Sequence, residues 1–232
     1  MWQLTASLGF VKIVERFVVL SLEFQDELAG VSSLLSKARV AATMADLETD
    51  GVVSFTPAEL TEPWNMDDPK IIVKEKTSSS PALNDVVEKL RDKTGDELSR
   101  IVKSKKFDPL QGVLDNFEHN GLVSTHNPGP FRPTRYELVL DTTAEEVITP
   151  LTQVLLGRRE PTYEDRLLLG IIESINATGL MFATANADWE QKDFSNRVHE
   201  LDGHHPVLSV LHAQTSGTSA LMTKSQLGPA TL

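Results

Sequence analysis

The chain of 232 residues contains no cysteine, which excludes disulfides, thiolate metal ligands and cysteine nucleophiles and fits a reducing compartment. It also lacks any hydrophobic run near the ~20 residues that a membrane-spanning helix needs. The apolar stretch at residues 8–22 is interrupted by Lys12, Glu15 and Arg16, whereas a signal peptide has an unbroken apolar centre. We therefore predict a buried or amphipathic segment there.

Positive charge is scarce, with 22 Lys and Arg against 33 Asp and Glu and a net charge of −11. Because binding to a polyanion depends on the density of cations, this balance argues against a nucleic-acid surface spread over the molecule. An anion site must be a local concentration of basic residues. The sequence also lacks a nucleophile elbow, a phosphate-binding glycine loop and a dinucleotide fingerprint, so we predict a protein that is not an enzyme and needs no cofactor or metal.

Two stretches, 44–55 and 113–123, share one pattern: a helical apolar repeat, a glycine that ends the helix, and then β-branched residues. Each is followed by a second β-rich run, at 71–73 and 136–140, so we predict two hairpins. This pattern leaves open a winged-helix module or a helical domain that carries short hairpins.

Apolar periodicity and capping signals predict further helices. They lie at 32–47, 81–90, 98–103, 110–120, 143–155 and 163–178, with one or two more over 182–200. Capping boxes are predicted at Thr94, Thr143 and Thr162, and Ser80 is a candidate N-cap before Pro81. Prolines predict a loop, without a strand, over 56–69. Helix 163–178 is predicted to be the most buried.

The fold class that follows is mainly α. We predict a single helical domain over residues 1–212 with small β-hairpins around a central buried helix. Residues 213–232 are rich in Thr, Ser, Gly and Gln and have little to bury, so they are predicted to form a flexible tail.

Five segments in order, 18–22, 44–55, 71–90, 113–123 and 165–181, resemble the Golgi phosphoprotein 3 family. Its eukaryotic members are peripheral membrane proteins that bind phosphatidylinositol 4-phosphate, and it has many bacterial relatives. The resemblance runs from about residue 15 to 207 and suggests a divergent, bacterial-type member. It implies a mainly helical domain around a central helix, with hairpins at one end facing a membrane.

The resemblance also implies a headgroup site, although its residues are not in register. The lipid-binding members use a Trp and an Arg before the first Ala-rich helix and two basic residues three apart before the second glycine. This chain has no Trp in 28–34 and has Phe107 and Leu110 at the second position. The nearest cations, which become the candidate headgroup ligands, are Lys37, Arg39, Lys103, Lys105 and Lys106. The alternative is that these charges are solvated helix faces.

The family's membrane-contact hairpin corresponds to residues 124–136, where Phe131 is flanked by Arg132 and Arg135. An aromatic ring between arginines suits a membrane interface, and the alternative is again a solvated loop. Three histidines at 199, 204 and 205 lack the helical spacing of a zinc site, so a structural or surface role is predicted for them.

Three functions remain. The first is a cytoplasmic, peripheral adaptor for an anionic or phosphoinositide membrane, on the Golgi face in a eukaryote. The second is a winged-helix nucleic-acid regulator, although neither 38–50 nor 110–120 has the row of base-contacting side chains that groove readout needs. The third is a ligand-free scaffold for other proteins. The lipid, the organism and the oligomeric state are not set by the sequence.

Overall fold

Helices make up most of the computed structural model, which describes residues 12–56, 60–62, 65–66, 68–126, 134–140, 142–184, 189–201 and 204–226. The helices are α1 (Ile13–Glu23), α2 (Ser32–Thr49), α3 (Asn84–Leu90), α4 (Leu98–Lys103), α5 (Leu110–His119), α6 (Thr142–Leu155), α7 (Tyr163–Ser174), α8 (Thr178–Met181), α9 (Gln191–Leu201) and α10 (Pro206–Gln226). Three short 3₁₀ helices are η1 (Ala29–Val31), η2 (Pro81–Leu83) and η3 (Lys105–Phe107). The predicted mainly α class is confirmed.

The strands pair in three antiparallel hairpins. They are β1 (Val53–Phe55) with β4 (Ile71–Val73), β2 (Leu60–Glu62) with β3 (Asn65–Met66), and β5 (Val123–His126) with β6 (Arg135–Leu138). The first and third are the predicted hairpins. The second is a correction, because 56–69 was predicted to hold no strand. Its two strands are short enough to lie between the prolines at 57, 63 and 69, which fall outside both.

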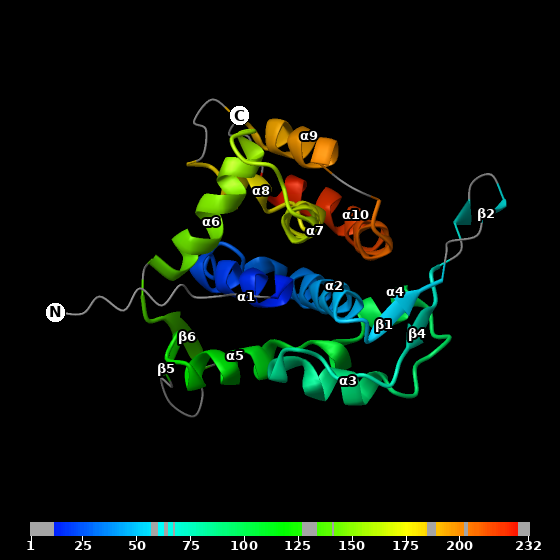
Figure 1. The fold of residues 1–232 in the computed structure, drawn as a ribbon. Helices are drawn as coiled ribbons and strands as arrows, with labels where there is room; N and C mark the ends of the chain where they lie inside the picture. Colours follow the sequence, from blue (N-terminus) through cyan, green and yellow to red (C-terminus); the bar gives the residue numbers. More distant parts are fainter. Residues whose placement is uncertain are drawn as a thin grey trace.

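Figure 1 shows α1 and α2 as a middle layer, with α6 to α10 on one side and α3, α5 and the β5–β6 hairpin on the other. Eight of the 11 residues of α1 and 12 of the 18 residues of α2 are buried, compared with seven of 12 in α7. The two middle helices are therefore the most buried elements, in place of the predicted segment 163–178. That segment divides into α7 and α8.

The middle layer is fixed by a side chain of α2 that caps α1. Asp46 accepts hydrogen bonds from the backbone N–H groups of Ile13 and Val14, at 2.9 Å each. The first N–H groups of a helix have no partner within the helix, so Asp46 supplies one for two of them. One turn later, Asp50 accepts from Lys12 Nζ at 2.7 Å. The end of α2 is thereby held at the start of α1, and the two helices run antiparallel.

The capping predictions divide. Thr162 forms the predicted box, because its hydroxyl accepts from the Asp165 N–H while the Asp165 carboxylate accepts from the Thr162 N–H. Thr94 does not cap a helix: α4 begins at Leu98, and the Thr94 hydroxyl accepts from the N–H of Val73 on the edge of β4. The box predicted at Thr143 is also wrong. Helix α6 begins at Thr142, and the Thr143 hydroxyl is buried without a hydrogen-bond partner among the described residues. Ser80 precedes Pro81 as predicted, but its hydroxyl bonds to Glu15.

The predicted boundary at residue 213 falls inside α10, which continues to Gln226. Thr215 is buried, and Gln214 donates from Nε2 to the carbonyl of Ser99 at 2.9 Å, so this part of the helix packs on α4. A flexible tail beyond it stays a prediction. In the part of the chain described, no helix has the length and apolar character to span a membrane.

We predict that Ile172→Ala lowers the free energy of unfolding by about 2–5 kcal/mol, because the Ile172 side chain is fully buried in α7 and its loss leaves a cavity. The control is Arg166→Ala on the same helix, whose exposed side chain should cost no more than about 0.5 kcal/mol. Urea unfolding of both variants measures the difference. Equal losses would contradict the packing of α7.

We also predict a pH dependence from Asp46. Burial raises the pKa of Asp46 from 3.8 to about 7, against the lowering effect of its two N–H donors. The folded state then keeps a proton that the unfolded state has lost, so the contribution of Asp46 to stability falls as pH rises from about 4 to about 7. Asp46→Asn removes this titration, and its stability relative to wild type should improve over that range in urea unfolding.

The control for this experiment is Asp50, whose pKa is shifted in the opposite direction to that of Asp46. Burial alone would raise the pKa of Asp50, but hydrogen bonds from Lys12, Ser78 and Ser79 outweigh it and lower the pKa to about 2. The stability that Asp50 contributes is present above about pH 4 and is lost as pH falls towards 2, so the deficit of Asp50→Asn should shrink in acid. Parallel pH profiles for the two variants would contradict these assignments.

Candidate functional site

Three lysines, Lys103, Lys105 and Lys106, cluster where α4 passes into η3, and we name them the η3 lysines. All three are exposed, and none forms an ion pair with a carboxylate among the described residues. The buried ring of Phe107 anchors the segment, and Lys106 Nζ lies 5.6 Å from its centroid. Both α2 and α3 contact η3. This is the local concentration of positive charge that the composition requires of an anion site.

Arg39 lies beside this segment on α2, but it already has an anionic partner. Its Nε donates to Asp108 Oδ1 at 2.8 Å and its Nη2 to Oδ2 at 2.7 Å, with both side chains largely buried. Asp108 Oδ1 also accepts from the N–H of Leu110 at the start of α5, at 3.1 Å. A bidentate pair of this kind is strong and directional, so Arg39 is committed to holding α5 against α2.

Lys37, two residues before Arg39 on α2, also has a partner within the protein. Its Nζ donates to the carbonyl of Gln214 on α10 at 3.2 Å. The structure therefore brings α2, α4, η3 and α10 together. However, of the five candidate headgroup ligands, only the η3 lysines are exposed without a protein hydrogen-bond or ion-pair partner in the described chain.

One carboxylate close to the η3 lysines is that of Asp92, two residues past the end of α3. Asp92 Oδ2 accepts from Lys93 Nζ at 3.2 Å. Lys93 lowers the pKa of Asp92, and Lys106 adds a smaller effect in the same direction. The end of α3 thus reaches the cluster and adds one cation and one anion, so the cluster remains positive.

The membrane-contact hairpin is described only in part. Phe131 and Arg132 lie outside the described residues, so a membrane contact there stays a prediction. Arg135, the first residue of β6 and next to the hairpin loop, pairs with Asp26 in the segment between α1 and α2, with Nη2 and Oδ1 2.9 Å apart. Both side chains are mostly exposed, so this ion pair contributes little stability.

One residue of the histidine-rich segment, His205, packs against the end of α2. The N–H of Val207 donates to His205 Nδ1 at 3.2 Å, so the ring proton lies on Nε2, which faces Glu48 Oε2 at 2.7 Å. Phe55 and Tyr163 pack edge-on against this ring, each with its centroid 6.0 Å away. Burial, followed by Glu48, raises the pKa of Tyr163 to about 12. Among the described residues, no group of three or more His, Asp or Glu side chains is arranged to hold a metal.

A second basic group was missed from the sequence. A cavity of about 840 Å³ lies between two parts of the chain. One part is residues 73–77, which begin at the last residue of β4, and the other is Val87 on α3 with Arg91 just past its end. Lys74 and Lys76 line it. The available signal was the spacing of Lys70, Lys74 and Lys76 at even intervals, which in an extended segment places side chains on one side.

Comparison with protein families gives one match: the family model described as Golgi phosphoprotein 3 (GPP34) matches residues 13–214 of the chain. Comparison with curated proteins gives no match. The matched range begins at α1 and ends within α10, and it includes α2, η3 and the β5–β6 hairpin.

We predict a strong coupling between Arg39 and Asp108. Removing either side chain leaves a buried charge without its partner, so Arg39→Ala or Asp108→Ala should each cost about 3–5 kcal/mol, and the double variant much less than the sum. The exposed pair Arg100 and Glu97 is the control, with an expected coupling below about 1 kcal/mol. Urea unfolding of both double-mutant cycles measures the two energies. If they are equal, Arg39 is not held by Asp108 in solution.

Proposed function

We propose that this chain, which belongs to the Golgi phosphoprotein 3 family, is a peripheral protein that binds anionic membrane surfaces from the cytoplasmic side. The η3 lysines supply the attraction, and the β5–β6 hairpin is the candidate apolar contact. The family is not a known enzyme family, and the proposal assigns no reaction to the chain.

The observation that carries the proposal is the uneven pairing of cations in an acidic protein. The arginines and lysines of α1 and α2 are taken up by internal partners: Lys12 by Asp50, Arg16 by Asp165, and Arg39 by Asp108. The η3 lysines are exposed, and none of them forms an ion pair with a carboxylate of the described chain. Charges left in this state concentrate counter-ions and attract an anionic surface.

The geometry favours a general anionic surface over a closed headgroup pocket. The position where the lipid-binding members have two basic residues is filled by Phe107, which is buried, and Leu110. Arg39 is largely buried and is held by Asp108 through two hydrogen bonds. A phosphorylated headgroup would meet the exposed η3 lysines, which are point charges on flexible stems and discriminate poorly between phosphates.

The expected binding is weak. A lysine near an anionic membrane contributes about 1 kcal/mol, so the η3 lysines together supply about 3 kcal/mol, whereas a micromolar dissociation constant needs about 8 kcal/mol. An apolar contact or a second cationic group is needed for lasting attachment. The attraction is also screened by salt, because the Debye length is ~10 Å at 0.1 M ionic strength.

We predict that Lys105→Glu combined with Lys106→Glu abolishes binding to phosphatidylcholine vesicles that contain phosphatidylserine, because each substitution turns attraction into repulsion. Flotation at low and at physiological ionic strength measures the effect, and wild-type binding should fall as salt rises. A parallel set of vesicles with phosphatidylinositol 4-phosphate at matched charge tests selectivity. Equal binding to both sets supports the general surface.

The matched control is Arg166→Glu combined with Lys192→Glu, which makes the same change in net charge at exposed positions on α7 and α9. This variant should bind like wild type. Equal loss in both variants would mean that only net charge matters, and no binding of wild type at low salt would favour the ligand-free scaffold.

A further inference from the structure

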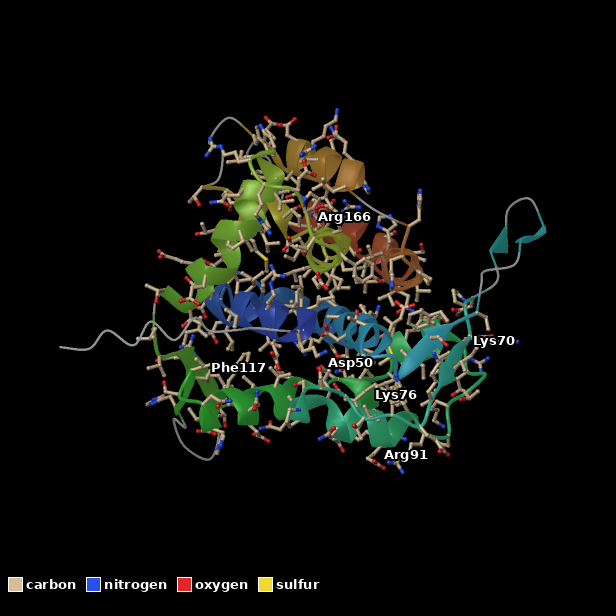
Figure 2. The ribbon with its side chains drawn as sticks, viewed as in Figure 1. Asp50, Lys70, Lys76, Arg91, Phe117 and Arg166 are labelled. Atoms are coloured by element: carbon tan, nitrogen blue, oxygen red, sulfur yellow. The ribbon has the colours of Figure 1, made fainter. Side chains whose placement is uncertain are left out.

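The cavity beside β4 is a second basic site at the β1–β4 end of the molecule. Figure 2 shows Lys70, Lys76 and Arg91 at this end, whereas Arg166 lies in the layer on the other side of α1 and α2. One wall of the cavity is the segment 73–77, which bends at Glu75 where the N–H of Lys76 donates to the carbonyl of Lys74 at 2.8 Å. The other wall is the face of α3 that carries Val87, with Arg91 at its end. Neither wall includes a residue of the η3 cluster.

The charges that line the cavity are three cations and one carboxylate, Glu75. Lys74 and Lys76 are exposed, and neither forms an ion pair with a described residue. Arg91 Nη2 lies 2.6 Å from Glu88 Oε1, but both groups are well exposed and the guanidinium has five N–H donors, so it keeps donors for a ligand. Lys70, two residues before Ile72 on the outer side of β4, is also exposed.

The segment that carries the lysines is fixed in place. Asp50, at the end of α2, accepts from the hydroxyls of Ser78 and Ser79 at 2.8 and 2.9 Å and from the Ser79 N–H at 3.0 Å. At the other end, the N–H of Lys74 donates to the carbonyl of Val52 at 2.8 Å. Lys76 extends over Gly51, where a Cβ on the glycine would lie 3.1 Å from the lysine Nζ. The cavity wall is therefore held at both ends before any ligand arrives.

We propose that this cavity binds a small ligand that carries a phosphate monoester. Lysine and arginine together are the side chains that recognise phosphate, the arginine by directed pairs of hydrogen bonds and the lysine by charge. Val73 and Val87 provide an apolar floor for the part of the ligand next to the phosphate, and Thr77 adds a hydroxyl. The cavity is open to solvent on one side, and its volume of about 840 Å³ gives room for a small molecule.

The same chemistry has two sources, a soluble phosphate ester or the headgroup of a lipid. In either case the site goes beyond the membrane attraction proposed for the η3 lysines, because different residues form it. If the ligand is a lipid headgroup, this cavity is the second cationic contact with the membrane that the protein needs, because the η3 lysines alone bind weakly. A soluble source would make the cavity a ligand site independent of the membrane.

The test is calorimetric titration of the full chain with glycerol 3-phosphate and with inorganic phosphate, at constant ionic strength. We expect saturable binding that is at least about tenfold weaker in Lys74→Gln combined with Lys76→Gln, because charge-assisted hydrogen bonds are lost. Arg91→Gln, as a second variant, should also weaken binding. The matched control, Arg166→Gln with Lys192→Gln, should bind like wild type. Lys105→Glu with Lys106→Glu should bind too, so this test is separate from the membrane proposal.

Flotation with phosphatidylcholine vesicles that contain either phosphatidic acid, a monoester, or phosphatidylglycerol, a diester, distinguishes the sources. If the Lys74 and Lys76 variant loses binding to phosphatidic acid alone, the ligand is a lipid headgroup. If it loses glycerol 3-phosphate and keeps both vesicles, the ligand is soluble. The proposal is overturned if wild type shows no saturable binding to either soluble probe, or if the cavity variants bind as wild type does.

Discussion

The contact on which the middle layer depends is the carboxylate of Asp46 against the first two N–H groups of α1. It lies inside the protein, where an unpaired N–H would be costly, and it joins residues 33 positions apart in the sequence. It fixes the start of α1 at the end of α2. Asp50, on the next turn, accepts hydrogen bonds from Lys12, Ser78 and Ser79. Glu15 accepts one from the Ser80 hydroxyl. The segment that leaves β4 is thus placed by the same junction that aligns the two central helices.

Internal ion pairs explain how an acidic protein keeps basic surfaces. Inside the molecule, acidic residues pair with cations from distant parts of the chain. Asp165 alone binds both Arg16, at 3.0 Å, and Arg159, at 2.6 Å, while Asp108 holds Arg39. Several carboxylates are in this way neutralised by internal partners, so the net charge of −11 describes the field at a particular surface poorly. The charges near the η3 lysines include Asp92 and Lys93. Lys93 lowers the pKa of Asp92, and Lys106 is close enough to Asp92 to add to this effect.

Local signals in the sequence predicted what local physics decides. The helix ends at Gly51 and Gly121 are correct because both glycines adopt positive φ, at 69° and 70°, as the pattern requires. The box at Thr162 is correct because it needs only neighbours. Thr94 has the same spacing, but tertiary structure uses its hydroxyl for the open edge of β4. No local pattern records that an edge strand will lie there.

The burial of α1 shows the same limit. Charges at 12, 15 and 16 indicate an amphipathic helix, yet each of those side chains has a partner from a distant part of the chain, at Asp50, Ser80 and Asp165. Partners of this kind are set by the fold. For the candidate site, residue type alone identified Arg39 as a cation in the right region, but no sequence pattern indicates its pairing with a residue 69 positions away.

That pairing bears on whether Arg39 needs a ligand as its anionic partner. A largely buried guanidinium needs an anion, because the cost of removing its charge from water is recovered only through close, hydrogen-bonded pairing. The resemblance implies that a lipid phosphate fills this need in the lipid-binding members. Here a carboxylate of the chain itself does so and also caps α5. With this internal anion in place, Arg39 does not depend on a lipid phosphate for a partner. Under the proposed function, attraction to a membrane then passes to the exposed lysines of η3, which respond to surface charge more than to the identity of the lipid.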